Sequence, residues 1–133
     1  MMVFAYVSAA IFALLGGLHL IYTLLDFWKG PRYFAPRDKT LLEQMRATQT
    51  AIAPKGRDYW SGILGFHLSH SIGVLLFSLL IVIAAGDPIL WLRVLLAATG
   101  ALYVLIAWRC WFHIPMWGSL IGTGLMVAAW ISP

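Results

Sequence analysis

Residues 59–85 read YWSGILGFHLSHSIGVLLFSLLIVIAA, a stretch without any Asp, Glu, Lys or Arg. A membrane-spanning helix needs about 20 apolar residues, so this stretch is long enough to cross a bilayer. It nevertheless contains two imidazoles, His67 and His70. Ionisable side chains inside hydrocarbon are costly and mark candidate functional sites. The stretch therefore predicts a transmembrane helix that carries part of a functional site.

Three further apolar runs, at about 2–28, 89–108 and 112–131, have the length and composition of membrane spans. Of the 133 residues, 62% are hydrophobic and 11% are charged. Soluble domains carry about a quarter charged residues. Strands of a membrane barrel would show alternating polarity over segments of about 10 residues, unlike these long runs. We therefore expect an all-α fold, a four-transmembrane-helix bundle forming a single integral membrane domain over 1–133.

Basic residues indicate the topology of this bundle. The polar segment 29–58 contains Lys29, Arg32, Arg37, Lys39, Arg46, Lys55 and Arg57, seven of the nine basic residues. Arg109 falls on the same side, and Arg93 alone on the other. The positive-inside rule then predicts a cytoplasmic segment 29–58, with the N and C termini outside. Basic residues beside membrane ends favour membrane lipids as partners, and no nucleic-acid partner is expected.

A short amphipathic helix is expected within this cytoplasmic segment. The run 38–43 (DKTLLE) has the composition of a helix start, and within it Thr40 and Glu43 have the spacing of a capping box. Apolar residues then fall on one side of a helix that ends near Pro54: Leu41, Leu42, Met45 and Ile52. Such a helix would lie on the inner leaflet, and a lid over the cytoplasmic mouth of the bundle is the alternative.

Polar residues of the first span form a stripe. At 100° per residue, all of them fall within about 60° of His19 on a helical wheel; they are Ser8, Tyr22, Thr23 and Asp26. His19 lies about 14 Å from Trp28 along the helix axis, and His67 and His70 lie about 12 and 17 Å from Tyr59. Because the two spans run antiparallel, the three imidazoles are expected at nearly the same depth.

This histidine layer admits four interpretations. Haem could be bound by His19 and either His67 or His70, in a cofactor site that Thr23 and Tyr22 would also line. A divalent metal could be bound by His19, His67 and His70, with Asp26 or water as a further ligand. The same side chains could form a path for protons or a small substrate. The histidines could also be purely structural and hydrogen-bond across helices.

Small residues suggest where helices approach one another closely. Gly62, Gly65, Ser69 and Gly73 form a seam along the second span, and Gly118 and Gly122 form a GxxxG motif in the fourth. Such seams support packing within the bundle, in a homo-oligomer or in a larger membrane complex.

Enzymatic activity has no support from motifs. The chain contains no Gly-rich phosphate loop, nucleophile elbow or HExxH zinc motif. Its single cysteine, Cys110, rules out an intramolecular disulfide.

At Gly17-Leu18-His19 with Thr23, and at 65–73 (GFHLSHSIG), the chain resembles small uncharacterised bacterial four-helix integral membrane proteins. The resemblance implies a four-helix fold in the bacterial inner (plasma) membrane and draws attention to His19 and His70, but it implies no reaction. The leading hypothesis is a small polytopic membrane protein with an intramembrane histidine-lined site for haem or a metal ion. The alternative is a non-catalytic subunit or assembly module of a larger membrane complex.

Overall fold

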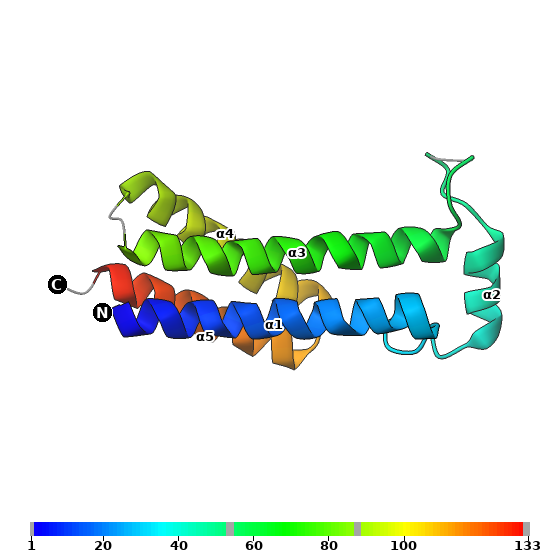
Figure 1. The fold of residues 1–133 in the computed structure, drawn as a ribbon, viewed down its shortest axis with the longest axis horizontal. Coiled ribbons are helices and arrows are strands. Elements are labelled where there is room, and N and C mark those ends of the chain that lie inside the picture. The colour runs from blue at the N-terminus through cyan, green and yellow to red at the C-terminus, as the bar shows by residue number, and fades with distance from the viewer. Residues whose placement is uncertain (1, 53–54, 87–88, 132–133) are drawn as a thin grey trace. The chain divides into compact units, whose positions relative to one another are not determined.

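The computed structural model describes residues 2–52, 55–86 and 89–131, and within these ranges it contains helices and no strand. The elements in chain order are α1 (Met2–Lys29), α2 (Lys39–Ala47), α3 (Tyr59–Gly86), α4 (Leu90–Cys110) and α5 (His113–Ile131) (Figure 1). All except α2 are long and apolar enough to cross a membrane. The predicted all-α class is confirmed, and the four long helices end within two residues of the predicted bounds of the spans.

The helices belong to two compact units. One unit comprises Met1–Gly17 and Gly73–Pro133, and the other comprises Leu18–Ile72. Helices α1 and α3 each contribute one part to each unit, whereas α4 and α5 belong wholly to the first. The expectation of a single membrane domain over 1–133 stays a prediction.

The first unit is built around Phe12 of α1, whose side chain is only 1% exposed. Its ring meets the ring of Phe77 on α3 edge-on, with centroids 4.8 Å apart, and lies 6.2 Å from Tyr103 on α4. Helix α5 approaches so closely that a Cβ atom at Gly122 would lie 2.8 Å from the Phe12 ring. One aromatic side chain thus contacts or closely approaches all three of the other long helices.

Hydrogen bonds between helices reinforce this core. The buried Ser8 hydroxyl donates to the Gly122 carbonyl at 2.7 Å, and the Ser78 hydroxyl donates to the Ala9 carbonyl at 2.7 Å. Gly118 is close-packed as well, since a Cβ atom there would lie 2.9 Å from Leu15. The GxxxG motif therefore serves packing within the chain, and its use in an oligomer stays a prediction.

The second unit contains α2, which is shorter than predicted. Asp38 is the N-cap: its carboxylate accepts hydrogen bonds from the Thr40 amide at 2.9 Å and the Thr40 hydroxyl at 2.7 Å. The hydrogen bonds from the Thr40 side chain and backbone hold the pKa of the Asp38 carboxyl below its usual value. The predicted helix start over 38–43 is confirmed. The capping box of Thr40 and Glu43 is wrong, because the Asp38 carboxylate takes the N-cap position two residues earlier.

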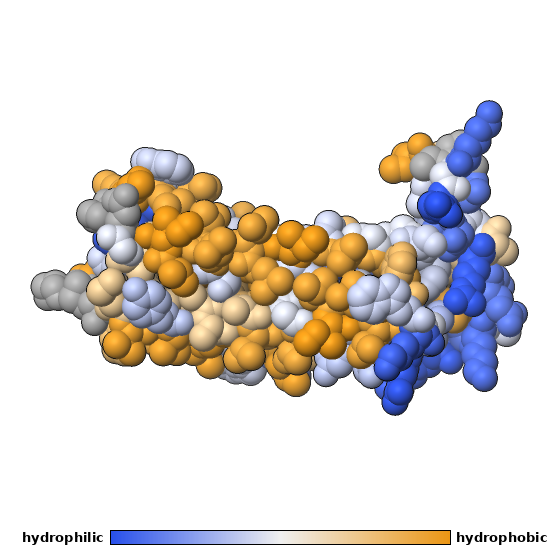
Figure 2. Space-filling model, viewed as in Figure 1, coloured by the Kyte–Doolittle hydropathy of each residue, from blue (hydrophilic) through white to orange (hydrophobic). Residues whose placement is uncertain are grey.

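The end of α2 was also wrongly predicted. The helix stops at Ala47 because Thr48 is extended, and the Thr48 carbonyl accepts a hydrogen bond from the Tyr59 amide at 2.9 Å. Ile52 is not on the helix and is 96% exposed. Pro54, the expected end, lies outside the described residues. Hydrophilic side chains gather over α2 and its flanking loops, while apolar side chains cover the long helices (Figure 2).

Candidate functional site

Three imidazoles converge in the second unit. Helix α1 carries His19, and the antiparallel α3 carries His67 and His70. The Nε2 atom of His19 and the Nδ1 atom of His67 are 2.9 Å apart, a hydrogen bond between two helices. The His19 ring centroid lies 5.0 Å from that of His67 and 5.3 Å from that of His70. The structure thus brings together the three histidines that the helical register places at one level.

Hydroxyl groups near the histidines are engaged by the helix backbone. The Thr23 hydroxyl donates to the carbonyl of His19 at 2.8 Å, and the Ser71 hydroxyl donates to the carbonyl of His67 at 2.8 Å. Such bonds to the preceding turn satisfy a buried hydroxyl without using another side chain. Thr23 is 1% exposed, as expected for the polar stripe, but its hydroxyl bonds the His19 backbone and not the ring. Its role in a cofactor site stays a prediction.

Phe34, which the sequence analysis missed, covers the histidine pair. Its ring stacks on His67 with a centroid distance of 4.2 Å and lies 4.7 Å from His19. The chain turns at Gly30, where φ is 97°, a value that favours glycine. The breaker Gly30-Pro31 was therefore the available sign that the chain leaves α1 here, although nothing in the sequence points to Phe34 itself.

Asp26 holds this loop in place. Asp26 is 2% exposed, and its carboxylate accepts three backbone hydrogen bonds, at 2.9, 2.8 and 2.8 Å. The donors are the amides of Arg32, Tyr33 and Phe34. Both carboxylate oxygens are thus engaged by the loop, and through it Asp26 positions the aromatic cover. The hypothesis that Asp26 is a metal ligand gains no support from these contacts.

Tyr22 also packs on the loop. Its ring stacks on Tyr33 with centroids 4.7 Å apart, and its side chain is 39% exposed. Among the described residues, no group of three or more His, Cys, Asp and Glu side chains is arranged to hold a metal ion. The site is therefore a cluster of three imidazoles under an aromatic ring.

A hydrogen-bonded pair of imidazoles can take up a proton at one ring and release one from the other. A neutral imidazole has one nitrogen that donates and one that accepts, and the other contacts of the ring determine which tautomer is present. The bond between His19 and His67 therefore joins an N–H to a bare nitrogen. A proton that arrives at one ring can be compensated by release from the other.

Comparisons with protein-family models, curated proteins and solved structures find no match to this chain. The geometry of the three imidazoles is therefore the basis for assigning a function.

Removing the aromatic cover should expose the histidines to reagents. In a Phe34→Ala variant, we expect diethylpyrocarbonate to modify His19 and His67 severalfold faster than in the wild type, because the ring stacked on them is gone. Tyr33→Ala is the matched control, since Tyr33 stacks on Tyr22 instead. The measurement is peptide mass spectrometry of the detergent-purified protein, with the exposed His113 as internal reference. Equal rates in both variants would show that Phe34 does not shield the pair.

Proposed function

We propose that the protein is a small polytopic membrane protein that holds and passes on a proton at an intramembrane site lined by His19, His67 and His70. The observation that carries the proposal is the 2.9 Å hydrogen bond between the imidazoles of His19 and His67. Ionisable side chains inside membranes commonly form proton relays in pumps and transporters. The third imidazole, 5.3 Å from His19 between centroids, extends the pair to a short chain of exchangeable groups.

A proton fits this geometry better than the haem or metal ion that the sequence also suggested. Metal–imidazole bonds are about 2 Å long, so two nitrogens on opposite sides of an iron would lie about 4 Å apart. The His19 and His67 nitrogens are closer, at 2.9 Å, and Phe34 stacks on the His67 ring. For this pair to bind an iron atom from opposite sides, the two nitrogens would have to move apart by about 1 Å, through rotation of the rings or movement of the helices. A proton needs no such movement.

Proton flux into vesicles tests this function. Purified full-length protein is reconstituted into liposomes, a potassium gradient with valinomycin drives proton uptake, and an enclosed dye reports internal pH. We expect wild-type vesicles to acidify faster than protein-free vesicles. His19→Ala should abolish the difference, and His113→Ala should retain it, because His113 is exposed and begins α5, outside the cluster.

Three results would overturn the proton proposal. The first is wild-type flux no faster than that of protein-free vesicles, and the second is an unchanged rate in His19→Ala. The third is stoichiometric haem or metal in the purified wild type, seen by absorbance and elemental analysis and lost in His19→Ala/His70→Ala. That third result would make the site a cofactor site instead.

The proposed topology has the N and C termini outside and segment 29–58 in the cytoplasm of a bacterial inner membrane. The excess of basic residues on one side supports the orientation. The assignment to a bacterial inner membrane rests on the resemblance of residues 65–73 to small bacterial membrane proteins. In this arrangement α2 lies at the inner leaflet and faces anionic lipid.

The single cysteine reports on this topology. Cys110 is exposed and falls on the cytoplasmic side in the proposed orientation. In intact spheroplasts, a membrane-impermeant maleimide should therefore leave it unlabelled, and permeabilisation should permit labelling. In a Cys110→Ser background, Leu90→Cys is the control on the opposite side, because Leu90 is 74% exposed at the start of α4. The reverse labelling pattern would invert the topology.

A second candidate function is that of a subunit or assembly module in a larger membrane complex, with purely structural histidines. One face of α3 favours it: among the described residues, nothing lies within 4 Å of a Cβ atom built at Gly62 or Gly65. Ser69 is exposed on the same helix. Such a face lets another transmembrane helix approach closely. Extraction in a mild detergent should then yield a larger complex of fixed stoichiometry, and recovery of free monomer alone would argue against it.

A further inference from the structure

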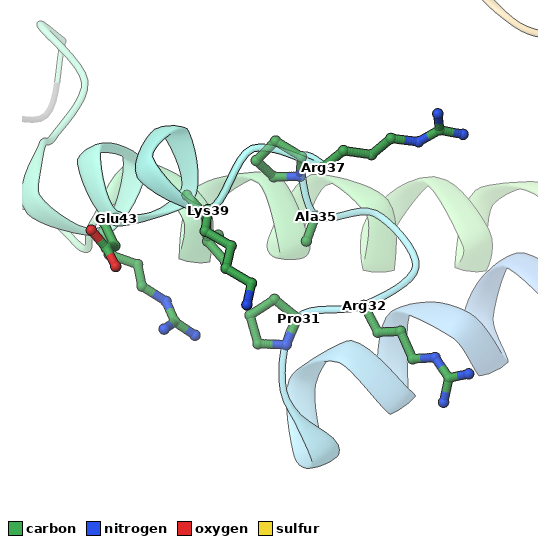
Figure 3. A pocket seen from close by; sticks show the side chains of 9 residues that line it. Pro31, Arg32, Ala35, Arg37, Lys39 and Glu43 are labelled. Atoms are coloured by element: carbon green, nitrogen blue, oxygen red, sulfur yellow. The ribbon is translucent and has the colours of Figure 1, made fainter.

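A cavity of about 370 Å³ lies in the second unit between the loop that follows α1 and the helix α2. Four basic side chains line it, together with one acidic side chain and two prolines. The charged residues are Arg32, Arg37, Lys39, Arg46 and Glu43 (Figure 3). Four positive charges against one negative charge leave an excess of three positive charges around the cavity.

The cationic groups come from two different walls. Lys39, Glu43 and Arg46 follow one another at helical spacing on α2, so they share one face of that helix. Arg32 and Arg37 belong to the loop, and their guanidinium groups extend away from α2, whereas the Lys39 side chain extends from α2 towards Pro31 (Figure 3). An anion between the walls would meet Lys39 first, and the two loop arginines, whose side chains are exposed, would turn towards it on binding.

The backbone of both walls is fixed, whereas the charged side chains are exposed and can adjust. The Asp26 carboxylate accepts hydrogen bonds from the amides of Arg32 and Tyr33, and Asp38 caps the start of α2. Pro31 and Pro36 restrict the chain further, because the proline ring fixes φ. Less ordering is then required on binding, which favours affinity for a ligand that fits.

We propose that this cavity binds a phosphate group. Arginine forms paired hydrogen bonds with phosphate, and lysine contributes a compact positive charge. The volume is at the small end of ligand pockets, which span about 300–1,000 Å³, and it suits a phosphate headgroup rather than a large cofactor. Pro31 follows the last residues of a candidate membrane span, so the phosphate of an anionic lipid is the nearest source. A soluble phosphate has the same chemistry.

The test compares two charge-matched variants of the full-length protein. Arg37→Gln/Lys39→Gln/Arg46→Gln removes three cations from the cavity. Lys29→Gln/Lys55→Gln/Arg57→Gln removes three from the same segment but outside the cavity. All six side chains are exposed, so the fold should survive, which circular dichroism verifies. Native mass spectrometry from phosphatidylglycerol-containing nanodiscs measures lipid binding, and thermal stabilisation by pyrophosphate in neutral detergent measures binding of soluble phosphate.

We expect the wild type and the outer variant to retain phosphatidylglycerol and the cavity variant to lose it. Glu43→Gln should tighten binding, because it removes the one carboxylate from the lining. If pyrophosphate stabilises the protein with the same selectivity and the lipid is not retained, the site takes a soluble phosphate. If both triple variants lose phosphatidylglycerol equally, binding depends on the overall positive charge of the segment and not on the cavity, and the proposal is overturned. Binding of neither probe would overturn it as well.

Discussion

In an Asp26→Ala variant, the amides of Arg32, Tyr33 and Phe34 should lose their protection from hydrogen exchange. Each donates to the Asp26 carboxylate at 2.8–2.9 Å. Hydrogen bonds to charged groups contribute about 1.5–3 kcal/mol each. Removing all three should therefore lower the free energy of local opening by about 4.5 kcal/mol or more, which corresponds to at least about 1,000-fold faster exchange. Exchange followed by mass spectrometry on the detergent-solubilised protein measures it.

The conservative variant Asp26→Asn refines this prediction. An amide side chain keeps one accepting oxygen and replaces the other by a donor. If that oxygen takes the Oδ1 position, the Arg32 and Tyr33 amides keep their acceptor and the Phe34 amide loses its own. Exchange should then accelerate mainly at Phe34. Asp58→Asn serves as the control, because Asp58 caps α3 through Ser61 and does not bond this loop. Wild-type protection in Asp26→Ala would show that the carboxylate does not hold the loop.

The second large effect is expected at Phe12. Phenylalanine-to-alanine substitutions in packed cores cost about 3–5 kcal/mol. Lipid tails are as apolar as the helix surfaces, so lost packing rather than transfer from water should dominate here, and we expect the lower end, about 3 kcal/mol. Equilibrium unfolding of the purified protein in mixed micelles measures the change.

A double-mutant cycle tests whether Phe12 acts through its contact with α5. Gly122→Ala alone should cost about 1–3 kcal/mol, because overpacking forces the ring to shift; the new methyl group would lie 2.8 Å from it. In a Phe12→Ala background, the vacated space accepts that methyl group, so the second substitution should cost much less. Gly124→Ala is the control, since no described residue lies within 4 Å of its Cβ position. Strict additivity would mean that the two residues do not interact.

The spans were predictable because hydrocarbon thickness sets the length of an apolar helix, and the register of two such helices is enough to align His19 with His67. The position of Ser8 followed from the same periodicity, and its hydroxyl does bond another helix. Periodicity did not identify the partner of Tyr22, which lies at the edge of the stripe and stacks on Tyr33 of the loop. A helical wheel contains no information about a loop that offers a competing partner.

The loop itself could not be derived from sequence. The partners of Asp26 are backbone amides, which every residue except proline possesses, so no residue type marks them. Phe34 is placed over the imidazoles by those bonds and not by any local pattern. The capping residue of α2 was mistaken for a related reason: Asp38 and Thr40 are both good caps, and only the backbone conformation decides between them.

The hydrogen bond between His19 and His67 also limits the number of excess protons that the pair can hold. It requires an N–H on one ring and a bare nitrogen on the other, and an imidazolium has no bare nitrogen. The pair can accordingly accommodate one excess charge and keep its bond, but two would place cation against cation where α1 meets α3. The pair can therefore hold one excess proton while this hydrogen bond is intact, and a second proton would break the bond.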